Sequence, residues 1–171
     1  MEGTELERYL PAYDFSERHQ ILIPVEAAKA YQILKSTKFS DIFWVRLLLK
    51  MRGISTQRTF EDLFTVLADN ENREVVWGLI GKPWTLSGSL IKFPPGQFLT
   101  FDERGFAKVA WNFLFTEKPE GTLVSTETRI FCTDPLSCKK FRMYWAFIRP
   151  FSGFLRKQML NQIATISRQR T

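Results

Sequence analysis

The sequence predicts an α+β domain in which a curved antiparallel sheet wraps around one long C-terminal helix. Two segments, 106–116 and 122–132, have the length and alternation of strands, and the loop 117–121 between them contains Pro119 and Gly121. These segments predict a central hairpin, and the second strand leads directly into the helix.

The C-terminal helix is expected over residues 134–168. Asp134 is suited to cap free backbone N–H groups, and Pro135 is suited to the first helical position. Apolar residues then recur at spacings of mostly three or four, which is the pattern of one apolar helix face: Phe141, Trp145, Ile148, Leu155, Met159, Ile163 and Ile166. At about 1.5 Å per residue the helix would be roughly 50 Å long, so the sheet must lie along it.

The N-terminal third predicts an arm, a strand and two short helices. Residues 1–13 are polar and weakly patterned, and we expect them to lie on the surface as an arm. A first strand is predicted over 13–23, and Pro24 ends it. Helical spacing then predicts helices over 25–35 and 40–52, the second closed by Gly53.

The middle of the chain predicts the rest of the sheet. Residues 54–61 are polar and predict a loop. The segments 64–68 and 73–80 flank four turn-forming residues and predict a hairpin. A further strand is expected over 84–93, and after it Phe98 and Phe101 predict one helical turn.

Composition favours a single domain over residues 1–171, rich in aromatic side chains. Aromatic residues make up 15% of the chain, with 16 Phe and 5 Trp, which suits either a thick core or a lined cavity. The first residues resemble no signal peptide and no apolar run is long enough to span a bilayer, so we expect a cytoplasmic protein. Cys132 and Cys138 match no metal or redox motif, and we expect reduced, partly buried thiols.

Positive charge is concentrated at the C-terminal end. Residues 135–171 contain eight basic residues and no acidic one. Because the whole chain is +6 and this segment is +8, the rest carries a net charge of −2. The charge indicates either a solvated helix face or attraction to an anionic partner, such as a ligand head group, a membrane surface or nucleic acid. Nucleic-acid binding is disfavoured, because most aromatic rings occupy inward-facing positions and no RNA-binding motif occurs.

The order of these elements resembles the helix-grip fold of the START-like superfamily, which includes Bet v 1 allergens, polyketide cyclases and lipid-transfer domains. The residues that carry the resemblance are the strand-to-helix junction 23–31 and the strand-strand-helix block 105–167, and segment 144–153 is similar to the last helix of an uncharacterised bacterial branch. The resemblance implies a curved sheet around a long helix with an apolar cavity between them. Because members range from carriers to cyclases, it selects no function.

Catalytic and cofactor motifs are few. His19 is the single histidine, so a catalytic triad or a multi-histidine metal site would depend on it alone, and we interpret it as a strand residue. Neither a GxGxxG sequence before a helix nor a P-loop occurs. We therefore expect no metal and no cofactor.

Candidate ligand-binding residues lie on the predicted inner faces of the strands and helix. Glu127 and Arg129 share one side of their strand, which is either the inner face, where they would orient a polar ligand group, or the outer face, where they would form a surface pair. The remaining candidates are apolar residues that form either a pocket wall or simple core: Trp77, Val109, Trp111, Phe113, Met143, Trp145 and Phe147.

The leading functional hypothesis is a non-enzymatic carrier or sensor of a hydrophobic or amphipathic small molecule, lipid-like or polyketide-like. The first alternative is a cyclase or hydratase-like enzyme in which Glu127 and Arg129 serve as the acid–base and orienting groups, and it requires both to face the cavity. The second alternative is a protein-interaction module, which a broad exposed apolar patch would favour.

Pro150 is expected to bend the C-terminal helix. Either the N-terminal half then packs on the sheet while the C-terminal half forms a movable lid, or the bend is static and follows the curvature of the sheet.

Overall fold

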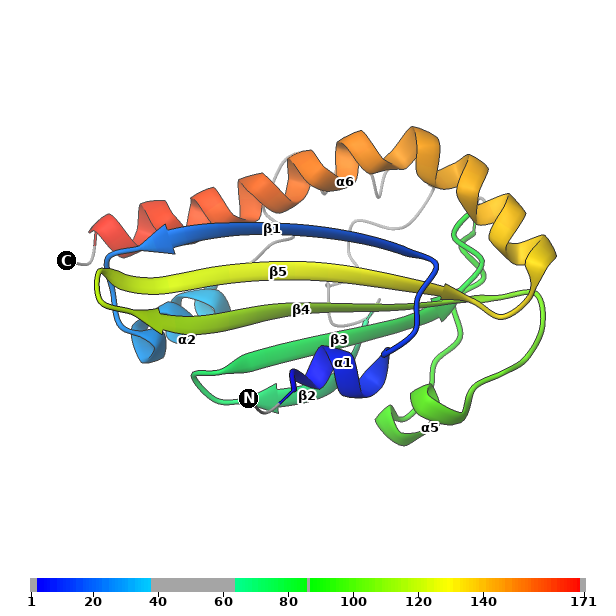
Figure 1. Ribbon diagram of the computed structural model, residues 1–171, viewed down its shortest axis with the longest axis horizontal. Helices are drawn as coiled ribbons and strands as arrows, with labels where there is room; N and C mark the ends of the chain where they lie inside the picture. Colours follow the sequence, from blue (N-terminus) through cyan, green and yellow to red (C-terminus); the bar gives the residue numbers. More distant parts are fainter. Residues whose placement is uncertain (1–2, 38–63, 86, 170–171) are drawn as a thin grey trace.

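The computed structural model describes residues 3–37, 64–85 and 87–169. Its strands form one antiparallel sheet in the order β1-β5-β4-β3-β2 (Figure 1). The strands are β1 (Phe15–Ile23), β2 (Thr65–Asn70), β3 (Glu74–Gly81), β4 (Ala107–Lys118) and β5 (Gly121–Cys132). The described helices are α1 (Glu5–Tyr9), α2 (Ala27–Ser36), α5 (Pro95–Thr100) and α6 (Pro135–Gln169). The α+β class and the helix-grip arrangement are confirmed, and the predicted helix over 40–52 and loop over 54–61 lie outside the described residues.

Tight turns set the register of the two hairpins. The β4–β5 strands pair from Ala107↔Cys132 to Lys118↔Gly121, so they extend through most of the predicted loop. Gly121 has φ 132, and a side chain there would collide with the carbonyl of Ile23. In the β2–β3 turn Asn72 adopts φ 62, which asparagine tolerates.

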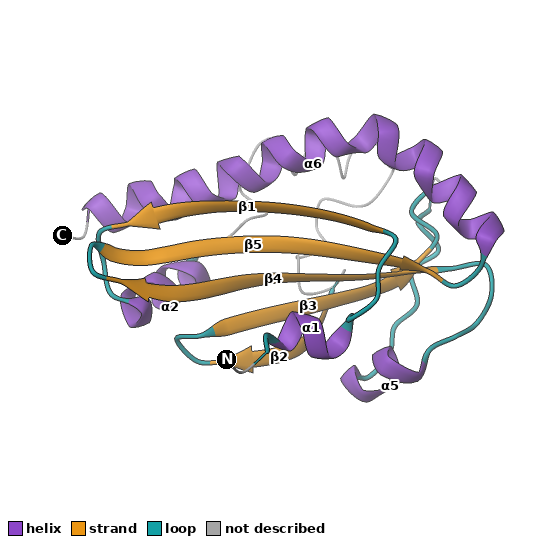
Figure 2. Ribbon diagram, in the orientation of Figure 1, coloured by secondary structure: helices purple, strands orange, loops and turns teal. Residues whose placement is uncertain are grey.

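The two faces of the sheet carry different helices. Alternate β4 residues, among them Trp111, Phe113 and Phe115, pack with α2 and the C-terminal half of α6. Ala110, on the opposite side of β4, packs with Leu6 of α1 and Phe98 of α5. We call the first side the inner face and the second the outer face. Figure 2 shows α6 running along the length of the sheet.

The predicted strand over 84–93 is wrong, and the arm contains a helix that was not predicted. Within the described residues 84–85 and 87–93, residues 87–89 form a turn and Ile91 makes one isolated bridge to Ile80, because Gly88 and Ser89 have positive φ. The arm contains helix α1, in which Thr4 and Glu7 form a reciprocal capping box.

Helix α6 begins as predicted. Asp134 Oδ1 accepts the backbone N–H groups of Leu136 and Ser137 at 3.0 Å each, and Oδ2 accepts the N–H of Gly105 at 2.6 Å. The helix continues through Pro150 and arches over the sheet in Figure 1. Its C-terminal half is the deeply packed part, with Ile163 fully buried, so the predicted division into a packed N-terminal half and a C-terminal lid is wrong.

Candidate ligand-binding site between the sheet and the long helix

Four predicted site residues lie on the inner face. Trp77 pairs with Trp111 across β3 and β4, and their rings stack with centroids 4.9 Å apart. The buried ring of Phe113 meets both tryptophans edge-on. Val109 packs farther along the same face, beside Phe141 of α6. The structure therefore brings three of the predicted aromatic residues together in one layer.

Glu127 and Arg129 lie on the outer face. Arg129 donates from Nε to Glu127 Oε1 at 2.6 Å and from Nη1 to the carbonyl of Leu10 at 3.3 Å, which holds the N-terminal arm. The enzyme hypothesis required both side chains on the inner face, so its assignment of these residues is wrong. Alternation placed the two residues on the same side of β5, but it did not specify which side the arm would cover.

The three predicted site residues of α6 lie on different sides of the helix. Trp145 stacks on the buried ring of Phe141 at 5.7 Å, whereas Met143 and Phe147 are 62% and 77% exposed. Met143 and Phe147 therefore point away from the sheet, contrary to the prediction. Helical spacing had placed Trp145 with Phe141 on the apolar face and left Met143 and Phe147 off it, so the periodicity of α6 identified the docking side and the pocket assignment of Met143 and Phe147 departed from it.

A group of polar side chains that the sequence analysis did not select lies between the inner face and α6. We call it the inner polar cluster, and its members are Glu17 and His19 of β1, Thr126 and Thr128 of β5, and Arg156 of α6. His19 Nε2 lies 3.0 Å from Glu17 Oε1, and both side chains are mostly buried. The register places Glu17 opposite Thr128 and His19 opposite Thr126.

Arg156 links α6 to this cluster. Its Nη1 donates to Thr126 Oγ1 at 3.2 Å, and the same oxygen accepts the indole N–H of Trp111 at 2.6 Å. The guanidinium lies over the Trp111 ring, 4.2 Å from its centroid. Burial lowers the pKa of Arg156 to about 9, and the negative charge of Glu17 opposes this shift. Arg156 therefore remains a cation at neutral pH.

Gly153 allows the helix to approach this pair closely. A methyl group in its place would lie 2.5 Å from Glu17 Oε1 and 3.4 Å from His19 Nε2. Glycine is thus the residue that lets the α6 backbone rest directly on the polar side chains of β1.

Two oxygens of the inner polar cluster, Glu17 Oε2 and Thr128 Oγ1, are buried and have no hydrogen-bond partner among the residues that the structure describes. Buried polar groups are normally paired, so each unpaired oxygen calls for an explanation. Together with Arg156 they offer two acceptors and a cation beside the Trp111 ring, a combination that suits one polar group of a mostly apolar molecule.

One signal in the sequence pointed to this cluster. Positions 17 and 19 share a strand face with Phe15, Ile21 and Ile23, so the alternation of β1 placed a carboxylate and an imidazole among apolar side chains. Arg156 gave no such signal, because it was grouped with the exposed cations of the helix.

Two further features lie away from the inner polar cluster. Asp14, Cys132 and Cys138 bring their possible ligand atoms within 4.8 Å of one another. Burial, with the neighbouring Cys138 and Asp14, raises the pKa of the Cys132 thiol.

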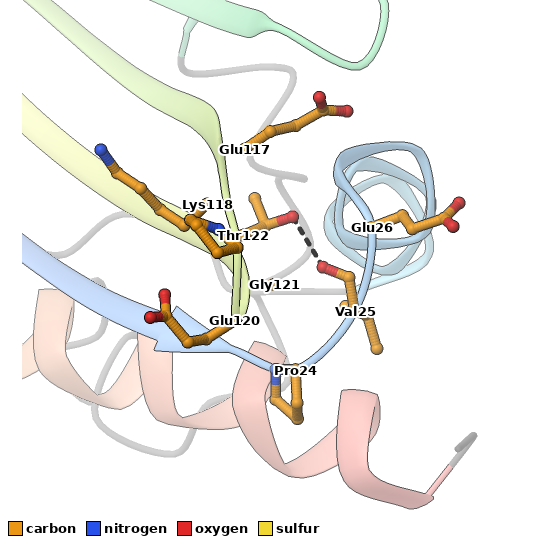
Figure 3. Close-up of a pocket in the computed structure, with 9 residues that line it drawn as sticks. Pro24, Val25, Glu26, Glu117, Lys118, Glu120, Gly121 and Thr122 are labelled. Carbon is orange, nitrogen blue, oxygen red and sulfur yellow. Dashed lines mark hydrogen bonds between the residues drawn. The ribbon is translucent and has the colours of Figure 1, made fainter.

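An open depression of about 500 Å³ lies at the β4–β5 turn (Figure 3). The hydrogen bond from Thr122 Oγ1 to the carbonyl of Val25, at 2.6 Å, joins β5 to the start of α2 there. The labelled side chains of Glu26, Glu117 and Glu120 extend outward in Figure 3. No member of the inner polar cluster lines this depression.

Comparison of the chain with known proteins returned matches among solved structures alone. No protein-family model matches it, and no curated protein matches it. It is similar to the di-domain ARO/CYC StfQ of the steffimycin biosynthetic pathway, at 10% identity and a TM-score of 0.46, over 97% of this chain and 53% of that one. The di-domain ARO/CYC BexL of the BE-7585A biosynthetic pathway matches at 13% identity and a TM-score of 0.41, over 93% and 52% of the two chains.

A Polyketide_cyc-like protein from Corynebacterium glutamicum matches at 15% identity and a TM-score of 0.34, over 90% of this chain and 85% of that one. This chain spans about half the length of the two di-domain proteins. Polyketide cyclase-like proteins are therefore among the solved structures to which this helix-grip chain is similar.

Proposed function

We propose that this protein binds an amphipathic small molecule between the inner face of the sheet and α6. The observation that carries the proposal is the inner polar cluster, where Glu17 Oε2 and Thr128 Oγ1 are buried beside the aromatic layer and find no partner within 3–37, 64–85 and 87–169. The ligand class is a largely apolar molecule with one polar group that includes a hydrogen-bond donor.

Each part of the cluster has a role in this proposal. A hydroxyl or N–H of the ligand donates to Glu17 and Thr128, while Arg156 attracts an oxygen or an anionic group of the same molecule. The apolar part of the ligand is stabilised by burial, at roughly 25 cal/mol per Å² before the costs of association. Specificity then comes from the polar group, because a molecule that lacks it leaves the cluster unpaired.

The first test asks whether the protein carries or takes up such a molecule. Native mass spectrometry and solvent extraction of the purified protein identify co-purifying molecules, and titration with the dye anilinonaphthalene sulfonate measures uptake. Because the exposed apolar side chains of α6 can themselves bind the dye, the titration is repeated with Phe147→Ser. Protein that purifies empty and takes up neither dye nor lipid in the Phe147→Ser background would count decisively against the proposal.

The second test uses Thr128→Val, which removes the unpaired hydroxyl with little change in shape. Free energy of unfolding should rise by about 1 kcal/mol, because a buried, unpaired polar group is lost. Ligand affinity should fall roughly fivefold to tenfold, because the ligand loses an acceptor. Ser125→Ala, at a buried position on the outer face of the same strand, is the matched control and should leave affinity unchanged. Equal ligand affinity in wild type and Thr128→Val would refute this site.

One observation favours catalysis as a second candidate function. The bond between His19 and Glu17 orients the imidazole, and the Arg156 cation faces the same layer, an arrangement that suits a general base beside a group that stabilises negative charge. This candidate replaces the earlier assignment to Glu127 and Arg129. It predicts that a ligand incubated with the wild-type protein changes in mass, whereas the same ligand incubated with the His19→Gln variant does not. Identical ligand masses in both samples would contradict catalysis and support binding without reaction.

A further inference from the structure

Helix α6 carries a row of exposed apolar side chains on the side that faces away from the sheet. Leu136, Met143, Phe147 and Phe151 are 61%, 62%, 77% and 52% exposed. Their spacings of seven, four and four place them on one face of the helix, and we call this row the outer stripe. The buried Phe141 lies on the other side of the helix.

The outer stripe is too concentrated to be ordinary surface. Single exposed apolar residues are common, but contiguous apolar patches mark places where a protein meets another apolar phase or partner. Figure 2 shows α6 along the periphery of the molecule, which leaves this side of the helix accessible.

The residues around the outer stripe are all basic where they are charged. Lys139 and Lys140 flank the stripe, each one turn from Leu136 and Met143, and Arg142 and Arg149 are exposed elsewhere on the helix. None of the ion pairs formed among the described residues involves these four. No acidic residue occurs between positions 135 and 171. The stripe is therefore an apolar surface in a purely positive border.

We propose that the outer stripe docks this protein on the surface of an anionic lipid bilayer, with α6 lying in the plane of the interface. Large apolar side chains enter the boundary between headgroups and acyl chains, and the basic residues contact lipid phosphates. Each basic residue near an anionic membrane strengthens binding about fivefold. A protein partner is less well matched, because lysine is depleted from the cores of protein interfaces.

The proposed attachment is peripheral. No helix in the described ranges combines the length and hydropathy that crossing a membrane demands. The proposal does not depend on the ligand site, because the inner polar cluster lies on the opposite side of α6. Variants of the two surfaces therefore separate membrane binding from ligand binding.

The test is co-sedimentation of the full chain with vesicles of phosphatidylcholine alone or with about one third phosphatidylglycerol. Wild type should partition strongly onto the anionic vesicles and weakly onto the neutral ones. Phe147→Ser should lower the partition coefficient on the order of tenfold, because less apolar surface is buried. Reversal of both lysines, K139E/K140E, should lower it by at least roughly 30-fold.

Matched controls change the same chemistry elsewhere. Leu22→Ser alters a residue that is 46% exposed on β1, and K92E/R104E reverses two exposed basic residues outside α6. Both controls should bind anionic vesicles as wild type does, and circular dichroism checks that every variant is folded.

Three outcomes would overturn the proposal. The first is wild type that remains in solution with anionic vesicles, and the second is stripe variants that bind as strongly as their controls. The third is a concentration-dependent dimer that Phe147→Ser dissociates without any vesicle binding, which would assign the outer stripe to a second copy of the chain.

Discussion

Glu74→Gln should release the N-terminal arm, because this buried carboxylate holds helix α1 on the outer face. Glu74 is 1% exposed. It accepts the N–H groups of Glu5 at 2.7 Å and Leu6 at 3.2 Å, and the side-chain amide of Asn112 at 2.6 Å. The carboxylate thus lies at the positive N-terminal end of α1, where it accepts these three hydrogen bonds.

The magnitude follows from these three contacts. Glutamine keeps one oxygen and replaces the other with an NH₂ group, which must face at least one of the three donors. At least one charge-assisted hydrogen bond is lost, worth about 1.5–3 kcal/mol, and the favourable charge at the helix N-terminus is removed, worth about 0.3–1 kcal/mol. We expect the free energy of unfolding to fall by about 2–4 kcal/mol.

Urea denaturation measures the change, and amide hydrogen exchange shows whether it is centred on α1. Protection should fall first in Glu5–Tyr9, whose buried Leu6 packs on the outer face of the sheet. Glu71→Gln, at an exposed position of the same hairpin, is the matched control and should change stability by less than about 0.5 kcal/mol. If Glu74→Gln unfolds at the same urea concentration as this control and α1 keeps its protection, the assigned anchoring role is incorrect.

Two further predictions concern the start and the middle of helix α6. Hydrogen bonds from the side chain and backbone of Ser137, and from the Gly105 N–H, lower the pKa of Asp134 from 3.8 to about 2. The Asp134 carboxylate therefore contributes fully to stability above pH 3.8, and this contribution is lost as the pH falls through about 2. Asp134→Asn should therefore flatten the loss of stability over this acid range in urea denaturation, and an unchanged slope would contradict it. Gly153→Ala should displace the carboxylate of Glu17 and lower the free energy of unfolding by about 1–3 kcal/mol. Gly96→Ala is the control, because a methyl group there meets nothing within 4 Å and should leave stability unchanged. Equal stability of the two variants would show that α6 does not rest on β1 as described.

The sequence by itself determined the elements whose signals are local. Asp134 followed by Pro135 marks a helix start with groups that act within one turn, and the structure places the first residue of α6 at Pro135. The alternation of β4 and β5 and the short loop between them likewise determined the central hairpin. Turn chemistry was the weak point, because the apolar residues of 84–93 resembled a strand although Gly88 and Ser89 interrupt it with positive φ.

Only the tertiary structure decided which face of each element is the inner one. Alternation pairs Glu127 with Arg129 equally well on either side of β5, and the choice depends on the arm, whose Leu10 carbonyl accepts from Arg129 at a sequence separation of 119 residues. A five-residue helix such as α1 is marginal alone, and Glu74 stabilises it from far along the chain.

Long-range packing also decides what covers each side of α6. Helical spacing placed Phe141 on the apolar face and left Phe147 off it, but only the tertiary structure shows that Phe147 stays exposed. The inner polar cluster arises only when Arg156 of α6 and the paired Glu17 and His19 of β1 come to the same face of the sheet from elements that are far apart in sequence. Side-chain type and local spacing set which elements form, and long-range packing sets which of their faces become a site.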